Sequence, residues 1–344
     1  MIRLVILLAI AFFTSQVFAA GNVCIPGNVL NRPANGQAVY WPASWRTNET
    51  APPLEAGQSC SWTVTVPSGY YAKLMISGKV SDNTSFFQTV DTAGNLIKTT
   101  HENKEPYYFP SPKFSLVVSN QAAATFAFRI VWAKFPSTLQ FSMGIGAEPQ
   151  LFNITDEVFA ADYSAITGLS LLAFPADPKN YHTLRSTLVF EGKDYTGNYV
   201  SNLYLLYKTR NQWISSGKVI YVVNLEARHW LDMLLVQESG YTKDITKYVQ
   251  MDCPRNSTCN VSVEAGDKKV AFISVGQKTD FISNAQIFVD AYLTVYYGSQ
   301  NQQGYHESLS GYDISSNLPL TFSNDIIQYV VTHGPASLNY HVDP

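Results

Sequence analysis

Residues 60–77, CSWTVTVPSGYYAKLMIS, constrain the fold more than any other stretch of this chain. Apolar and polar residues alternate up to Pro67–Gly69, and the alternation resumes after that break. A period of two is typical of a strand with one buried face, so the stretch predicts a strand pair joined by a turn. The residues expected to face one common core are Cys60, Trp62, Val64, Val66, Tyr70, Ala72, Leu74 and Ile76.

The same stretch carries a family motif. Its residues resemble the run C-x-W-x-I-x-x-P-x-G-x-x-x-x-L-x-[FI] of CUB domains, through Cys60, Trp62, Val64, Pro67, Gly69, Leu74 and Ile76. The whole chain resembles the nematode secreted CUB-like proteins. This resemblance implies an all-β fold of tandem CUB-like antiparallel β-sandwiches, jelly-roll-like in arrangement. It also implies membership in a group associated with the innate immune response to bacteria.

Similar apolar segments along the rest of the chain predict further strands. They lie at residues 86–94, 114–118, 126–132, 164–174, 187–192, 219–225, 229–236, 293–298, 326–332 and 337–342. Trp62, Phe126, Phe128 and Trp132 are expected in the core. Pro106, Pro110 and Pro112 are expected in loops, because proline disrupts strand pairing. Residues 226–238 also nearly fit a helical period, but a strand is favoured because residues 219–225 offer a hairpin partner.

The domain organisation follows from length and from an internal alignment. A shift of 199 residues places Cys259 on Cys60 and aligns the apolar positions of the two segments without a gap. We therefore expect three similar units after a leader at residues 1–19. Their expected bounds are 20–137, 148–240 and 241–344. The alternative is a first unit followed by one larger β domain over residues 148–344.

The N-terminus predicts secretion. Arg3 precedes the apolar run from Leu4 to Phe13, and Val17–Ala19 offers a small-residue cleavage site, as in a signal peptide. No later stretch is long and apolar enough for a membrane span, so an extracellular protein is expected. The formal net charge of −3, without any run of like charges, predicts no nucleic-acid partner.

Cysteines and sequons agree with an extracellular location. An even number of cysteines in a secreted chain implies disulfides. Pairing of Cys24 with Cys60 and of Cys253 with Cys259 is favoured, because cross-pairing would tie sequence-distant domains together. The spacing also lacks the short C-x2-C element of many zinc sites. Acceptor sequons for N-glycosylation, which predict exposed loops, stand at Asn48, Asn83, Asn153, Asn256 and Asn260.

A search for catalytic and metal motifs predicts no enzyme, no cofactor and no metal site. His101–Glu102 and His306–Glu307 begin an H-E-x-x-H pattern, but Glu105 and Ser310 stand where the second histidine is needed. Many CUB domains hold calcium with acidic loop residues. In the corresponding run here only Asp91 is acidic, while Ser85 and Gln88 replace the other acids, and one carboxylate does not make a calcium site.

Aromatic side chains remain as candidates for ligand binding. Trp41, Trp45 and Tyr71 are candidate positions at which a sugar ring would stack, although aromatic residues in β proteins mostly pack in the core. The expected function is non-enzymatic recognition of an extracellular glycan or protein ligand, including microbial surfaces, by loops at the sandwich ends. The alternatives are a secreted hydrolase with an unrecognised site and a structural component of matrix or cuticle.

Overall fold

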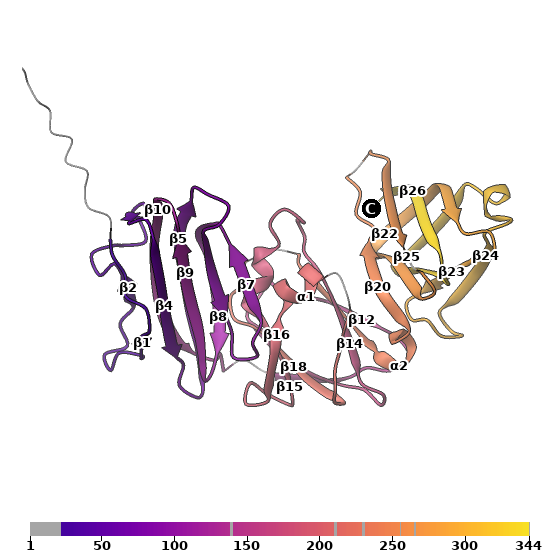
Figure 1. The fold of residues 1–344 in the computed structure, drawn as a ribbon. Coiled ribbons are helices and arrows are strands. Elements are labelled where there is room, and N and C mark those ends of the chain that lie inside the picture. Colours follow the sequence, from indigo (N-terminus) through magenta and orange to yellow (C-terminus); the bar gives the residue numbers. More distant parts are fainter. Residues whose placement is uncertain are drawn as a thin grey trace, which may run out of the picture.

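The regular secondary structure of the chain is mostly β-strand, with little helix, which confirms the all-β class (Figure 1). This computed structural model describes residues 22–343 except 138–139, 210–211, 229–230, 255 and 265. The predicted leader therefore lies outside the described residues. We use the terms first unit, second unit and third unit for residues 22–137, 140–240 and 241–343, which follow one another from left to right in Figure 1.

The first unit is a sandwich of two five-stranded sheets. One sheet has the order β1 (Asn28–Leu30), β4 (Gln58–Thr65), β9 (Lys113–Asn120), β6 (Phe86–Val90) and β7 (Leu96–Thr99). The other has the order β2 (Val39–Trp41), β10 (Ala124–Lys134), β5 (Tyr70–Val80) and β8 (His101–Pro110), with β3 (Pro53–Leu54) also paired to β10. All these pairs are antiparallel except β1 with β4, which is parallel.

Strands β4 and β5 have the predicted buried face, but they do not pair with each other. The inward positions from Cys60 to Ile76 are buried, apart from the half-buried Tyr70. The prediction of a strand pair is wrong, because β4 pairs with β1 and β9 while β5 pairs with β8 and β10. Gly69, with a φ of +78°, makes the turn that carries the chain from one sheet to the other. Alternation specifies which face is buried, not which strand lies alongside.

Aromatic rings fill the space between these two sheets. Trp62 of β4 contacts Phe126 and Phe128 of β10, with ring centroids 6.0 and 5.0 Å apart. Trp132 is also buried, and its indole N–H donates to the carbonyl of Thr65 at 2.8 Å. The predicted core positions of these aromatic residues are confirmed. Together, buried rings of this size contribute a large share of the hydrophobic stabilisation of the fold.

The prolines near residue 110 correct the sequence prediction in part. Pro106 and Pro110 lie inside strand β8, not in loops. Strand β8 pairs only with β5 and forms one edge of its sheet. An edge strand has one side that needs no hydrogen-bond donor, so proline is tolerated there. Pro112 does lie in the bend between β8 and β9, as predicted.

The second unit also has two sheets. One has the order β11 (Gln140–Gly144), β13 (Phe159–Ser164), β18 (Val219–Asn224), β15 (Thr187–Glu191) and β16 (Asn198–Asn202); the other has the order β12 (Gln150–Asn153), β19 (Met233–Glu238), β14 (Leu169–Phe174) and β17 (Trp213–Ile214). Short helical segments accompany them: η1 (Tyr181–Ser186), α1 (Leu203–Thr209) and α2 (Ser239–Thr242). The expected hairpin of residues 219–225 with 229–236 is wrong, since β18 and β19 lie in different sheets. Residues 233–238 are strand and not helix.

The third unit is one seven-stranded sheet. Its order is β21 (Cys259–Glu264), β26 (Pro335–Asp343), β22 (Lys269–Ile287), β25 (Leu320–Val331), β23 (Tyr292–Tyr297) and β24 (Tyr305–Ser310), with β20 (Ile245–Gln250) also paired to β22. The turn η2 (Ile314–Ser316) precedes β25. Strands β21 and β22 occupy the segment aligned with β4 and β5, but among the described residues β21 pairs with β26 alone, while β4 has two neighbours. The internal repeat therefore stays a prediction.

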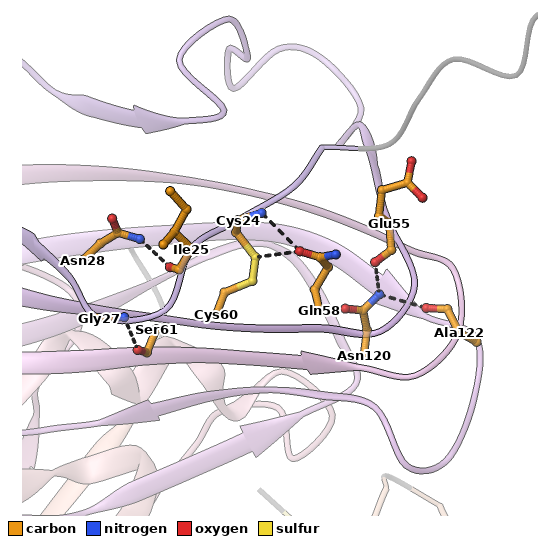
Figure 2. The surroundings of a disulfide bond; sticks show 10 residues. All are labelled: Cys24, Ile25, Gly27, Asn28, Glu55, Gln58, Cys60, Ser61, Asn120 and Ala122. Atoms are coloured by element: carbon orange, nitrogen blue, oxygen red, sulfur yellow. Dashed lines mark hydrogen bonds between the residues drawn. A yellow bond between two sulfur atoms is a disulfide. The ribbon is translucent and has the colours of Figure 1, made fainter.

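Both predicted disulfides are confirmed. Cys24 bonds to Cys60 and Cys253 bonds to Cys259, each with Cα atoms 5.7 Å apart. Figure 2 shows how the first bond ties the N-terminal segment to β4. The Cys24 backbone N–H donates to the side-chain carbonyl of Gln58 at 3.3 Å, and the Gly27 N–H donates to the Ser61 hydroxyl at 2.8 Å. No helix within the described part of the chain has the length and apolar character needed to cross a membrane.

Candidate binding site

A groove of about 370 Å³ opens where loops of the first and second units meet. We term it the loop groove. The first unit contributes the turns after β4, β6 and β8, and the second unit contributes the loop between β15 and β16. Hydroxyl and amide groups stand on both sides of it: Ser68, Thr92 and Ser111 from the first unit, and Thr196 and Asn198 from the second. The groove therefore offers many hydrogen-bonding groups within a small concave surface.

Two stacked rings form the apolar wall of the loop groove. Phe135 and Tyr195 lie parallel, with centroids 4.5 Å and planes 2° apart. Phe135 is buried, and Phe190 packs against its edge at 6.1 Å. Tyr195 remains 36% exposed. A ring held against a buried partner has little freedom to lose on binding, so Tyr195 is a prepared surface for an apolar ligand face.

The loop that carries Tyr195 is fixed by its own hydrogen bonds. The Thr196 N–H and hydroxyl both donate to the Asp194 carboxylate, at 2.8 and 2.6 Å, and these bonds hold the pKa of that carboxyl below its usual range. The Gly197 N–H donates to the Asp194 carbonyl at 3.1 Å. A Cβ atom at position 197 would lie 2.3 Å from the Glu191 carbonyl oxygen, so only glycine fits without a shift of the backbone.

A partly buried polar contact ties the two units together beside the groove. The Asn95 amide donates both to the Asp91 carboxylate at 2.9 Å and to the Val200 carbonyl at 2.8 Å. Asp91 and Asn95 belong to the first unit, whereas Val200 lies in β16 of the second. Burial raises the pKa of the Asp91 carboxyl, and burial together with the Asp91 charge raises the pKa of Tyr199. The Asp91 carboxylate already accepts hydrogen bonds from Ala93 and Asn95, so its role here is structural.

A second tie between the units is a buried ion pair. Arg185 of η1 donates two hydrogen bonds to Glu102 of β8, at 3.1 and 3.2 Å, and each side chain is only 6% exposed. The guanidinium also lies over the rings of Tyr107 and Tyr204, at 3.8 and 4.7 Å from their centroids. Tyr107 donates a hydrogen bond to the same Glu102 carboxylate. A charge pair this well enclosed holds the two units in one relative position.

Weaker ion pairs surround the buried one. Lys73 of the first unit lies 2.8 Å from Glu226 of the second, and Arg228 lies 3.4 Å from Glu105. His182 Nε2 lies 3.2 Å from the same Glu105 carboxylate. Burial lowers the pKa of His182, although the Glu105 charge opposes this shift. These contacts are partly exposed, so each contributes less than the enclosed pair.

The predicted sugar-binding aromatic residues lie apart from the open part of the groove. Trp45 is 2% exposed, and Trp41 is half-buried against Trp62 and Phe128. Tyr71 is half-buried and packs against Tyr108 and Phe135, so it lies behind the stacked pair. Their burial gives no support to direct stacking on a sugar. Their assignment as ligand-binding residues stays a prediction.

The residues that form the loop groove were not among the sequence-predicted site residues. Tyr195, Thr196 and Asn198 stand in the segment EGKDYTGN, which links two strands of the second unit. Aspartate, glycine and asparagine so close together indicate a tight turn, and because connecting segments run over the surface, an aromatic ring within the turn is expected to be exposed. Phe135 gave no such signal, because its partner Tyr195 lies in another unit.

The structure also shows the surroundings of the five sequons and of the run that resembles the calcium loop of CUB domains. Asn48, Asn83, Asn153, Asn256 and Asn260 are all exposed, as acceptors of N-glycans must be, and their occupancy stays a prediction. The Ser85 and Thr84 hydroxyls both donate to the Asp82 carboxylate, and these hydrogen bonds lower the pKa of Asp82. Within the described residues, no group of three or more histidine, cysteine or acidic side chains is arranged to hold a metal ion.

Comparisons with known proteins identify the first unit. A family model described as a CUB-like domain matches residues 19–136, so this part of the chain is a CUB-like domain. Two models described only as domains of unknown function, DUF7592 and DUF7591, match residues 147–225 and 240–343. No curated protein matches the chain.

Solved structures with several CUB domains are also similar at a low level. The CUB1-EGF-CUB2 domain of human MASP-1/3 is 9% identical with a TM-score of 0.22, covering 54% of this chain and 94% of that one. The CUB1-EGF-CUB2 domains of rat MASP-1 are 8% identical with a TM-score of 0.23, covering 61% of this chain and 99% of that one. Scores this low carry no conclusion about a shared arrangement of domains.

Proposed function

We propose that this protein is an extracellular, non-catalytic recognition protein that binds a glycan in the loop groove. The observation that carries the proposal is the stacked pair of Phe135 and Tyr195 beside a set of hydroxyl and amide groups. A sugar ring has one face of C–H groups and a rim of hydroxyls. The Tyr195 ring suits the first, and side chains such as Asn198 and Thr196 suit the second.

Several features support a secreted protein with a role in defence against bacteria. The two disulfides fit an oxidising, extracellular environment. The predicted N-terminal leader and the exposed sequons also support a secreted protein. The immune role comes from the resemblance to secreted CUB-like proteins and from the proposed groove, which suits the glycans of a microbial surface. Protein ligands remain the second class of partner for the same loops.

One cluster has the groups that the alternative of a hydrolase would require. In the third unit the Thr332 hydroxyl lies 3.1 Å from His333 Nδ1, and His333 Nε2 lies 3.2 Å from the Asp290 carboxylate. A hydroxyl, an imidazole and a carboxylate in series are the parts of a nucleophilic triad. However, Thr332 also accepts a hydrogen bond from the Tyr292 N–H, and Asp290 is largely exposed. These features support a structural contact at the strand ends over catalysis.

The proposal is tested with a glycan and bacterial-surface array, probed with the full mature chain in calcium and in EDTA. For any glycan that binds on the array, Tyr195→Ala should weaken binding by about tenfold or more, because the stacking surface is removed. Tyr312→Ala is the matched control, since Tyr312 is 78% exposed in the third unit and lines no part of the groove. Equal binding by both variants, or turnover of an ester or glycoside that His333→Ala abolishes, contradicts the proposal.

A further inference from the structure

A second cavity, of about 190 Å³, lies between the second and third units, away from the loop groove. We term it the inter-unit cavity. One of its walls is strand β14, whose two faces are both buried. Leu171 and Ala173 face the core of the second unit, whereas Leu172 and Phe174 face the third unit and pack in a separate cluster with Ile273. Where these two surfaces meet, the packing leaves a space closed on one side by helix α1.

The interior of the inter-unit cavity is apolar and aromatic. Leu172, Leu206 and Ile273 line it together with the rings of Phe174, Tyr207 and Tyr248. The Tyr248 hydroxyl is fully engaged: it donates to the Gln328 side-chain carbonyl at 3.1 Å and accepts from the Gln300 amide at 3.1 Å. Its ring therefore meets the cavity mainly as an apolar and π surface. Benzene binds in an engineered apolar cavity of about 150 Å³, so a body of about one ring fits this space.

One acidic residue, Asp252, belongs to the lining, and its side chain is 42% exposed. No lysine, arginine or histidine is present among the described residues that line the inter-unit cavity. Lys278 forms an ion pair with Asp252, but its Nζ lies 3.9 Å from the carboxylate, which is too long for a hydrogen bond. The carboxylate therefore retains the capacity to accept hydrogen bonds from a ligand.

The backbone around Asp252 is held in place from three sides. The preceding Met251 N–H donates to the Ile273 carbonyl at 2.8 Å, and the following Cys253 is bonded to Cys259. The Tyr340 hydroxyl donates to the Asp252 carbonyl at 3.1 Å. A charged residue on such a fixed segment keeps its position relative to the cavity, and a preorganised group loses little entropy when a ligand binds.

From these contacts we infer that the inter-unit cavity binds a small organic ammonium ion whose apolar part is about the size of one ring. The apolar part fills the space between Leu172 and Ile273. The ammonium group meets the Asp252 carboxylate and the faces of the aromatic rings, the combination by which proteins bind organic cations. A carboxylate ligand is excluded by repulsion from Asp252. The inference does not depend on the glycan-binding proposal.

The first test compares three probes of one shape on the unmodified full chain at pH 7: benzylammonium, benzyl alcohol and benzoate. Titration calorimetry measures affinity, and methyl NMR locates the shifts. Benzylammonium should bind about tenfold or more tightly than benzyl alcohol, benzoate should not bind, and the shifts should appear at Leu172 and Ile273. Equal affinity for the three probes, no binding of any, or shifts elsewhere would overturn the inference.

Variants then assign the two parts of the site. Asp252→Asn should lower the affinity for benzylammonium about tenfold and leave that for benzyl alcohol unchanged. Asp267→Asn is the matched control, an exposed aspartate of the third unit that lines no part of the cavity. Leu172→Trp fills the space and should abolish binding of both probes. If Asp252→Asn and Asp267→Asn behave alike, the carboxylate has no role and the inference fails, while Tyr195→Ala remains a separate test of the loop groove.

Discussion

The ion pair between Glu102 and Arg185 provides the most direct test of how the first two units are joined. Removing one partner of a buried pair leaves the other charge unpaired in a poorly solvated place, which typically costs about 3–5 kcal/mol. Both side chains are 6% exposed, so solvent screens the pair only weakly. Arg185→Met should therefore lower the free energy of unfolding by about that amount.

A double variant separates the charge effect from the loss of packing. Glu102→Gln removes the charge but keeps a carbonyl that accepts the hydrogen bond from Tyr107. In the combination of Glu102→Gln with Arg185→Met no buried charge is left alone, so most of the lost stability should return. The coupling free energy between the two positions should then be about 2 kcal/mol or more, within the range seen for contacting residues.

Urea unfolding followed by tryptophan fluorescence measures these differences. Arg228→Met is the matched control, because Arg228 pairs with Glu105 and Glu226 in a partly exposed position and its loss should cost about 1 kcal/mol or less. The reasoning is refuted if Arg185→Met and Arg228→Met are equally destabilising. Strictly additive effects of the two substitutions at the buried pair would also refute it.

Three further predictions concern the same fold. Burial lowers the pKa of His182 below its usual 6.5, so its contribution to stability is present above about pH 6.5 and lost as the pH falls through the folded pKa; His182→Gln should flatten that dependence in unfolding midpoints measured from pH 8 to 5. Trp62→Ala should cost about 3–5 kcal/mol in thermal unfolding, since it empties the centre of the first sandwich. Gly78→Ala should cost about 1–3 kcal/mol, because a Cβ there would lie 2.7 Å from the Thr125 carbonyl oxygen, and an unchanged melting temperature would contradict this contact.

The burial pattern of the first unit could be predicted from the sequence because it depends on local alternation. Trp62 and Val64 each stand between polar neighbours at a period of two, and both are buried. The disulfides could be predicted because each joins cysteines from the same end of the chain. The strand partners could not, because β4 and β5 satisfy the same alternation whether they pair or face each other across the core.

The candidate site could not be predicted from the sequence, for a different reason. The groove, the buried ion pair and the inter-unit cavity are all formed by residues of two units, so no local pattern contains them. Glu102 was noticed only as part of an incomplete metal motif, and its partner Arg185 lies 83 residues away. A glutamate within the polar run HENKE gives no sign that an arginine distant in the sequence will pair with it in a buried place.

The way in which the second unit covers the first bears on how recognition by the CUB-like domain would work. Phe135 and Tyr108 of the first unit pack in one buried cluster with Phe190 and Tyr221 of the second. A CUB-like domain separated from the rest of the chain would expose that apolar surface together with the charge of Glu102, and it would lose the loop that carries Tyr195. If the proposed function is right, ligand selectivity depends on both units, and substitutions at their contact should change binding on the glycan array by altering the loop groove.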